Sequence, residues 1–490
     1  MRSTRTVPKL TAAGVTAAAL LVFTMPAARA AVPLTKIITD SFSNTTSQHN
    51  TAVEPDTFAF GNTIVAATQV GRFNDGGGSD IGYATSTDGG TTWAQGTLPG
   101  ITSYNGGGGS FARVSDPTVA YDAMHNVWLI STVPITSSVT VPNVFVNRST
   151  DGGLSFGNPV TVASGSTSFD KNWTACDNTA TSPFYGHCYT EFDDNANGDR
   201  LKMSTSTDGG LTWGPALNTG NSATGIGGQP VVQPNGTVIV PAANASESAI
   251  IAWRSTNGGT SWASTVTVSS VTSHSEAGSL RSGSLPSAEI DATGKVYVAW
   301  RDCRFRSRCK ANDIVFSTST DGVTWTAVSR VPIDATTSGV DHFIPGLGVN
   351  PATSGTTAQL GLTYYFYRTS ACGSTCQLEV GYIQSNDGGS TWNTHTDVAG
   401  PFSVTLCPNT TQGRMVGDYI STSWIGGKAI GAFAVAQPPS GGAAFDQAIY
   451  IPTGGLTGAS SGFVNSSAGD HPVPGAASDH ASPKSAIRLG

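Results

Sequence analysis

The chain has 490 residues and a formal charge of −7, with 25 Lys and Arg against 32 Asp and Glu. This acidic balance argues against a nucleic-acid-binding protein, because affinity for the phosphate backbone comes mainly from clustered Lys and Arg. The length exceeds that of one ordinary domain, so either several domains or one large repeat array is expected.

The N-terminus has the three parts of a secretory signal peptide. A basic start (residues 1–9) precedes an apolar stretch (10–23), and small residues follow at 28–30. The apolar stretch is shorter than the roughly 20 residues that span a bilayer, so cleavage after residue 30 is favoured over a retained anchor. The mature chain then has 21 basic and 32 acidic residues, a charge of −11. We expect a secreted, extracellular protein that has no membrane contact after cleavage.

One motif, S-x-[D/N]-G-G-x-[S/T]-[W/F], occurs six times along the chain. Each copy follows a β-rich run, and its two glycines permit backbone angles that other residues resist. The Asp or Asn side chain can cap backbone amides of the turn, and the Ser or Thr hydroxyl can add a further bond. Each copy therefore predicts a hairpin turn with a built-in clasp. The copies begin at Ser86, Ser149, Ser206, Ser255, Ser319 (one residue short) and Ser385.

This motif resembles the Asp box, or BNR repeat, of the sialidase-type β-propellers. The resemblance covers nearly all of residues 34–454 and implies a stack of four-stranded antiparallel blades around an axis. The same motif occurs in propellers that are not enzymes, so it indicates fold more than activity.

Strand–turn–strand patterns precede the motifs, for example at 117–132, 229–244 and 287–300, where Gly and Asn separate runs rich in Val, Ile, Tyr and Trp. Such runs are typical of β-hairpins. Seven first strands are predicted, about 60 residues apart, which favours seven blades, with six as the alternative. They begin near Pro55, Pro117, Asn172, Gln229, Ser287, Pro345 and Asp418.

The seventh unit lacks the motif and one strand, whereas residues 34–41 form a strand that belongs to no other unit. We therefore predict that the N-terminal strand completes the last blade and closes the ring, which removes open sheet edges. The predicted propeller occupies residues 31–455. Residues 456–490 are rich in Ser, Ala, Gly and Pro and are expected to be a disordered tail.

Seven cysteines remain in a chain whose export permits disulfides. Sequence spacing suggests three local pairs and leaves Cys407 over, although spacing alone does not determine connectivity. The pairs are Cys176 with Cys188, Cys303 with Cys309, and Cys372 with Cys376.

The loops that lead into the first strands share one face of a propeller, and we expect function there. Cleavage of a glycosidic bond needs a proton donor and a second group that attacks or activates water. The candidate catalytic residues are Asp116, Glu289, Asp418 and Tyr419. Candidate substrate-binding residues are Arg113, Lys171, Arg281, Arg301, Asp302, Arg304 and Arg414, since arginines bind anionic groups bidentately. For each of them the alternative is solvation or a hydrogen bond that joins adjacent blades.

The loop 301–310 holds five of the 21 basic residues of the mature chain, and a Cys303–Cys309 disulfide would order it. Concentrated positive charge in an acidic protein favours a site for an anionic glycan. The alternative is salt bridging to neighbouring acidic loops.

Asp193, Asn195, Asn197 and Asp199 have the opening spacing of a calcium loop. The twelfth position is Ser204, where a bidentate carboxylate is expected, so a plain Asn/Gly turn is favoured over calcium. We expect no other cofactor.

The resemblance to sialidases implies three arginines around a substrate carboxylate, a tyrosine nucleophile paired with a glutamate, and an aspartate acid/base. The first of those arginines lies in a Phe/Tyr-Arg-Ile-Pro motif, whereas the comparable stretch here is Val53-Glu54-Pro55-Asp56. Tyr419 and Tyr365 are candidate nucleophiles. Two hypotheses follow: a monomeric sialidase-like glycoside hydrolase acting on anionic glycans, or a non-catalytic propeller that binds glycans or proteins.

Overall fold

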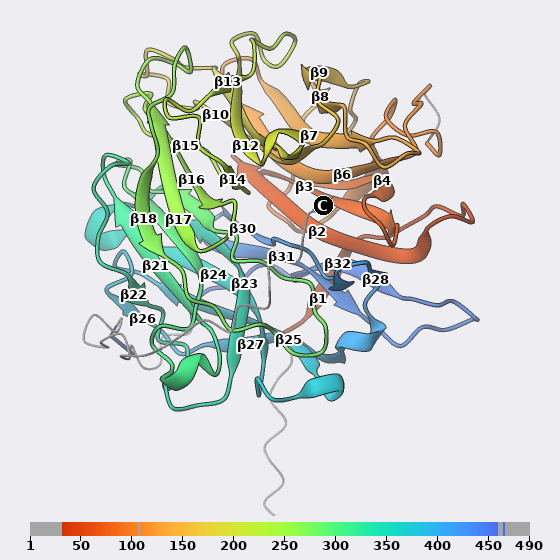
Figure 1. Ribbon diagram of the computed structural model, residues 1–490, viewed down its shortest axis with the longest axis vertical. Coiled ribbons are helices and arrows are strands. Elements are labelled where there is room, and N and C mark those ends of the chain that lie inside the picture. Colours follow the sequence, from red (N-terminus) through yellow and green to blue (C-terminus); the bar gives the residue numbers. More distant parts are fainter. Residues whose placement is uncertain (1–31, 106–107, 459–463, 466–490) are drawn as a thin grey trace, which may run out of the picture. The chain divides into compact units, whose positions relative to one another are not determined.

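The computed structural model describes residues 32–105, 108–458 and 464–465, and these form mainly antiparallel β-sheet (Figure 1). The predicted signal peptide and residues 459–463 and 466–490 of the predicted tail lie outside the described residues. Within the described part, no helix has the length and apolar character needed to cross a membrane. The helical segments described are short 3-10 turns: η1 (Asn195–Asn197), η2 (Ser307–Cys309), η3 (Gly355–Thr357), η4 (Gly373–Thr375) and η5 (Val404–Leu406).

Antiparallel units of four strands follow one another along the first half of the chain. The first unit contains β2 (Gln48–Phe60), β3 (Thr63–Arg72), β4 (Gly78–Ser86) and β5 (Ala94–Thr97). The next contains β6 (Arg113–Asp122), β7 (Val127–Ile135), β8 (Asn143–Ser149) and β9 (Val160–Ser164), and a single pair, Gly78 with Val114, joins it to the first. A third contains β10 (Phe169–Cys176), β11 (Cys188–Asp194), β12 (Arg200–Ser206) and β13 (Leu217–Asn218).

The pattern continues through the second half. One unit contains β16 (Val238–Asn244), β17 (Ala249–Ser255) and β18 (Val266–Ser270), with β14 (Gly225–Ile226) and β15 (Val231–Val232) both paired to β16. The next contains β19 (Ser287–Ile290), β20 (Val296–Asp302), β21 (Asp313–Ser319) and β22 (Ser329–Arg330). It is followed by β23 (Asp341–Val349), β24 (Leu360–Tyr367), β25 (Gln377–Ser385) and β27 (Thr396–Ser403). Two short pairs accompany them: β26 (Thr391–Trp392) with β33 (Val464–Asn465), and β28 (Asn409–Thr410) with β29 (Gly413–Arg414).

The last sheet combines the two ends of the described chain. It contains β30 (Ser421–Ile425), β31 (Lys428–Ala436), β32 (Gln447–Pro452) and β1 (Leu34–Ile38), in the order β1-β32-β31-β30. Leu34 pairs with Pro452 and Lys36 with Tyr450. The prediction that the N-terminal strand completes the last sheet is therefore confirmed. Leu456 is buried and pairs with Ala429, so ordered packing continues beyond the predicted boundary at residue 455.

The first strands of successive units contact one another. Contacts run from β2 to β6, β10, β15, β19, β23 and β30 in turn, and β30 contacts β2 again. In Figure 1, β2 (red) lies beside β31 and β32 (blue), so the first unit of the described chain contacts the last sheet. These contacts bring side chains from distant parts of the sequence to one centre.

The repeated motif forms the predicted clasp. In the third copy, Asp208 Oδ1 accepts hydrogen bonds from the amides of Leu211 (3.0 Å) and Thr212 (2.9 Å), and Oδ2 accepts from the Thr212 hydroxyl (2.6 Å). The Ser206 hydroxyl accepts from the Gly210 amide at 2.9 Å and donates to Asp208. Gly210 adopts φ +78°, an angle that favours glycine.

Apolar side chains pack between neighbouring units. Trp253, Trp300 and Trp392 are among the largest fully buried side chains, and each belongs to a cluster that includes residues of two units. The three predicted disulfides, Cys176–Cys188, Cys303–Cys309 and Cys372–Cys376, are present, and Cys407 is free and buried.

Candidate functional site

Four of the first strands contain a bulge at the same place, and in three of them the residue at the bulge is charged. Glu54, Asp116 and Lys171 have φ between +47° and +58°, and the strand register shifts next to each of them. A bulge bends its strand and redirects a side chain, and a positive φ is strained in a residue other than glycine. These first strands begin earlier than predicted, at Gln48, Arg113 and Phe169, because the pairing continues on both sides of each bulge.

The three bulges with charged residues bring their side chains to one point. Lys171 Nζ lies 3.6 Å from Glu54 Oε1, 3.3 Å from Asp116 Oδ1 and 2.9 Å from Asp418 Oδ2. All four side chains are buried, with 8% or less of their surface exposed. One ammonium group thus joins the first three units to the segment that leads into the last. We call these four residues together with Arg281 the Lys171 network.

Arg281 completes the network from a loop before β19. Its Nε donates to Asp418 Oδ1 at 2.8 Å and its Nη2 donates to Asp418 Oδ2, which makes a bidentate pair. The backbone of Arg414 holds this loop, because Arg281 N donates to Arg414 O at 2.7 Å and Arg414 N donates to Ser279 O at 2.8 Å. Charge-assisted bidentate bonds of this kind are strong and directional.

The carboxyl groups of the network have divergent pKa values. Burial raises the pKa of Glu54 to about 7, although Lys171 opposes this shift. Burial also disfavours ionisation of Asp418, but Arg281 and Lys171 outweigh it and hold the Asp418 pKa well below its usual range. Burial opposes the charge of Lys171, yet Asp116, Asp418 and Glu54 raise its pKa well above the ordinary value. Lys171 and Asp418 are therefore charged at neutral pH, and Glu54 titrates there.

A pocket opens above the network. Asp418, Arg281 and Lys171 form its polar floor, and a turn between β16 and β17 contributes Glu247 to its side. The other lining residues are Ile226, Ser282, Gly283 and Leu285. The pocket therefore presents two cations and two carboxyl groups to any ligand.

Of the predicted site residues, Asp116, Lys171, Arg281 and Asp418 are brought together. Tyr419 lies directly after Asp418, but its hydroxyl donates to the carbonyl of Pro117 at 3.1 Å, and burial raises its pKa well above the ordinary value. Tyr365 donates to the carbonyl of Ala434 at 2.8 Å and is equally buried. Neither tyrosine presents a free or acidic hydroxyl, so the geometry does not support either as a nucleophile.

Glu289 is not part of the network. It lies on β19, where burial and then the charge of Asp56 raise its pKa to about 8. Burial raises the pKa of Asp56 to about 7 as well. These two carboxyl groups form a second acidic pair on the first strands, separate from the pocket lining.

The remaining predicted binding residues have partners elsewhere. Arg113 pairs with Asp75 at 2.5 Å and lies over the ring of Phe73. Arg414 donates to the carbonyl of Cys407 at 2.8 Å and supports the Arg281 loop through its backbone. Neither lines the pocket.

The basic loop 301–310 is largely neutralised by acidic neighbours. Arg301 pairs with Glu276, Arg304 pairs with Asp302 at 2.7 Å, and Arg306 pairs with Asp313 and Asp334. These contacts match the salt-bridge alternative, and they leave Asp302 and Arg304 outside the pocket. Arg301 alone reaches toward it, because Nη1 donates to the Ser282 hydroxyl at 2.7 Å.

The predicted calcium residues form a turn whose polar groups contact one another. Asn195 Nδ2 donates to Asp199 Oδ1 at 3.0 Å, and Asn197 Nδ2 donates to Asp194 Oδ2 at 2.6 Å. Side-chain amides thus bind carboxylate oxygens, and Asp193 is buried on β11. The preference for a plain turn over a calcium loop stays a prediction.

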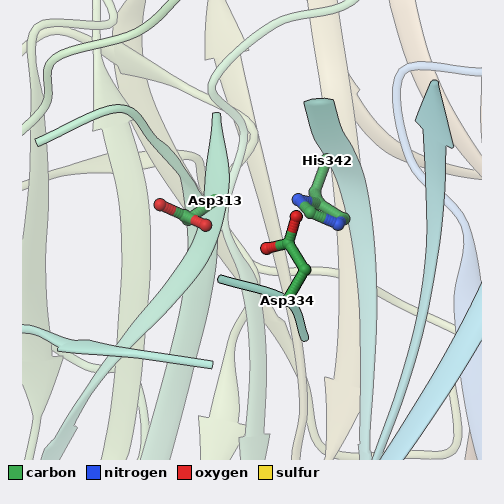
Figure 2. Close-up of side chains that lie close together, drawn as sticks. All are labelled: Asp313, Asp334 and His342. Atoms are coloured by element: carbon green, nitrogen blue, oxygen red, sulfur yellow. The ribbon is translucent and has the colours of Figure 1, made fainter. Parts of the chain in front are cut away.

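A further cluster, Asp313, Asp334 and His342, has the residue types of a metal site (Figure 2). Burial lowers the pKa of His342 to about 4, so its imidazole is neutral and able to bind a metal. Arg306 and Arg330, however, each contact both carboxylates, with the Arg330 distances at 2.8 and 2.9 Å. Two guanidinium groups already balance the charge, so the donor set does not fit a divalent cation.

The sequence interpretation missed Glu54 and Glu247 as site residues. Glu54 lies in the stretch that was compared with the sialidase arginine motif, and its position before a proline parallels Asp116-Pro117. This shared position before a proline was the sequence feature that could have identified Glu54 as a site residue. No sequence feature identified Glu247, because an Asn-Ala-Ser-Glu-Ser turn is ordinary in composition.

Comparison with protein-family models and with curated proteins gave no match. Among solved structures, the chain is similar to a polysaccharide lyase, an ulvan lyase bound to -[GlcA(1-4)Rha3S]-, with 11% identity over 86% of this chain and 96% of that one, and a TM-score of 0.50. It is also similar to a protein of unknown function from Dyadobacter fermentans (16% identity, 72% and 99% covered, TM-score 0.44) and to a Hadza microbial sialidase (19% identity, 64% and 63% covered, TM-score 0.43). At these identities the likeness concerns the fold alone.

Proposed function

We propose that the chain is a secreted seven-bladed β-propeller that acts on anionic glycans as a glycoside hydrolase at the pocket above the Lys171 network. The ring of contacts among the first strands and the pairing of β1 with β32 support seven blades and closure by the N-terminal strand. The signal-like N-terminus and three disulfides support export, because disulfides persist in oxidising compartments.

The main support for the enzymatic part of the proposal is the charge arrangement of the pocket. The pocket floor combines an ionised carboxylate, Asp418, with two cations, Lys171 and Arg281, which come from separate units. Directly behind them lies Glu54, whose pKa is raised to about 7. Carboxyl groups whose environments separate their pKa values are a recurrent mark of acid–base sites.

The arrangement suits the charges of glycoside hydrolysis. The transition state is oxocarbenium-like and develops positive charge at the sugar ring, which a fixed carboxylate such as Asp418 stabilises. Arg281 and Lys171 supply donors for a carboxylate or sulfate on the sugar. A site built from carboxylates fits this geometry better than one built on a tyrosine nucleophile, because Tyr419 and Tyr365 both have occupied hydroxyls.

The relatives known by structure agree with a glycan as ligand but do not select one. One of them is bound to an acidic, sulfated disaccharide unit and another is a sialidase. A monomer is proposed because β1 supplies the fourth strand of the last sheet from within the same chain.

The test is hydrolysis of fluorogenic glycosides by the mature chain beginning at Ala31. The panel contains 4-methylumbelliferyl α-sialoside, β-glucuronide and a 6-sulfated N-acetylglucosaminide. Asp418→Asn should lower kcat/KM for the cleaved substrate by about 100-fold or more, since it removes the fixed charge. Asp321→Asn, in a repeated turn far along the chain, is the matched control and should leave kcat/KM unchanged. No hydrolysis of any substrate by the wild type would overturn the enzymatic proposal.

A non-catalytic glycan-binding propeller is the second candidate. The low exposure of the network favours it, since only 8% of the Asp418 side chain and 3% of that of Lys171 are accessible. Titration calorimetry with the same free sugars distinguishes the two. Binding without turnover, abolished by Arg281→Met, would support this candidate.

A further inference from the structure

Glu247 occupies an unusual backbone conformation at the side of the pocket. It lies in the turn between β16 and β17 with φ +54°, and its amide donates to Asn244 O at 2.8 Å. Left-handed angles are strained in residues other than glycine, so the surrounding turn must impose this one. Two further hydrogen bonds to Asn244 Oδ1, from the amides of Ser248 (2.8 Å) and Ala249 (3.2 Å), stabilise the turn.

The loop that carries Arg281 holds the Glu247 carboxyl group. Glu247 Oε2 accepts a hydrogen bond from the amide of Ser284 at 2.8 Å. Gly283 makes the approach possible, because a Cβ at this position would lie 2.9 Å from Oε2. Arg301 steadies the same loop through the hydroxyls of Ser282 (2.7 Å) and Ser284 (3.3 Å).

The other carboxyl oxygen of Glu247 remains available. Within the described part of the chain, Oε1 has no hydrogen-bond partner, although its residue lines the pocket together with Asp418. Glu247 and Asp418 are the two carboxylic residues of the pocket lining, and they approach it from different units. A carboxyl group fixed through one oxygen and open through the other is placed to exchange a proton with a ligand.

The three carboxyl groups of this region differ in what they can do. Asp418 is bound by Arg281 and Lys171 and stays ionised, so it cannot give a proton at neutral pH. Glu54 has no exposed side-chain surface and contacts the pocket lining through the Lys171 ammonium and the Asp418 amide. Glu247 lines the pocket itself, and one of its carboxyl oxygens accepts from the Ser284 amide.

We propose that Glu247 is the catalytic proton donor of this pocket, an assignment that rests on the proposed glycoside hydrolase function. Glu247 Oε1 gives its proton to the glycosidic oxygen as the bond to the anomeric carbon breaks, and the bonding electron pair leaves with that oxygen. A water molecule then supplies hydroxide to the anomeric carbon, and its remaining proton returns to Glu247. The net reaction adds one water across the glycosidic bond and needs no other reactant.

The experiment compares leaving groups on whichever sugar the wild type cleaves. A proton donor matters for a poor leaving group and little for a good one, so 4-methylumbelliferyl and 2,4-dinitrophenyl glycosides of the same sugar are used. Glu247→Gln keeps an acceptor for the Ser284 amide and should fold. It should lower kcat about 100-fold or more on the 4-methylumbelliferyl substrate and less than about 5-fold on the dinitrophenyl substrate.

Glu379→Gln, at a carboxylate paired with Arg368 on β25, is the matched control and should leave both rates unchanged. An equal loss on both substrates, or no loss on either, would overturn the assignment of Glu247 while leaving the hydrolase proposal intact. A wild type inactive on both leaving groups would instead refute the hydrolase function itself.

Discussion

Lys171 holds a full positive charge where only 3% of its side chain is exposed. Three carboxyl groups within 3.6 Å of its Nζ compensate for the lost solvation. Removing one partner of a buried ion pair is costly because the remaining charges stay buried without compensation.

Lys171→Met should therefore lower the free energy of unfolding by about 3–5 kcal/mol, measured by urea denaturation at pH 7. Lys428→Met, at an exposed residue that begins β31, is the control and should change it by less than about 0.5 kcal/mol. A loss at Lys171 as small as that of the control would show that the network contributes little to stability.

Glu54 makes stability depend on pH. Its ordinary pKa is 4.5 and burial raises it to about 7, so between these values the folded protein holds a proton that the unfolded chain has released. The stabilisation is complete below about pH 4.5 and is lost as the pH rises through 7. The free energy of unfolding should therefore fall from pH 5 to pH 8.

In Glu54→Gln this fall should be smaller by an amount on the order of 1 kcal/mol, measured by urea denaturation across the same range. Because burial also raises the pKa values of Asp56 and Glu289, part of the slope should remain. An unchanged slope in Glu54→Gln would contradict the titration of Glu54 near pH 7.

The repeated turns stabilise their own hairpins through the clasp. In the third copy Asp208 accepts from two backbone amides and two hydroxyls. Its carboxylate is ionised at neutral pH, because hydrogen bonds from Thr212 and Ser206 outweigh burial and lower its pKa. The fourth copy uses Asn257, whose Oδ1 accepts from the Ser261 amide at 3.1 Å. An amide side chain can therefore replace the carboxylate in this turn.

Asp208→Ala should destabilise the protein by about 1–2 kcal/mol, because four donors lose their acceptor. Asp208→Asn should lower the free energy of unfolding by less than half of that amount, because the fourth copy forms the same turn with an asparagine. Thermal or urea unfolding measures both, and KM should not change in either variant because the turn does not line the pocket. Equal losses in the two variants would show that charge, rather than hydrogen bonding, matters there.

The last sheet depends on β1 for its fourth strand. Ile37 and Ile38 are buried in the last sheet, and β1 covers the edge of β32. An uncovered edge presents unpaired backbone groups that invite association with another chain.

A mature chain beginning at residue 40 should lose about 3 kcal/mol or more of stability and self-associate, since two buried isoleucines and one strand are missing. Light scattering and urea denaturation, compared with the chain beginning at Ala31, measure both effects. A truncated chain that stays monomeric and equally stable would show that β1 contributes little to stability or to protection of the β32 edge.

Most of the fold could be predicted from local sequence. Turn chemistry and alternating apolar residues act over about ten residues, so the strands, the clasps and the order of the units could be predicted from them. The disulfides followed for the same reason, because their cysteines are 4, 6 and 12 residues apart. The strand starts were predicted too late, since a bulge interrupts the apolar alternation while the backbone pairing continues.

The site depended on contacts that no local pattern encodes. Asp418 N donates to Glu54 Oε1 across 364 residues, and Lys171 reaches Asp116 and Asp418 from a third strand. The concentration of basic residues in loop 301–310 was plain in the sequence, yet Arg301 and Arg306 pair with Glu276 and Asp334, which only folding brings near. The sequence by itself determined a repeated antiparallel β architecture, because hairpins are local. Only the tertiary structure decided which charges neutralise one another and which face the pocket, because burial and ion pairing depend on distances between strands that are remote in the chain.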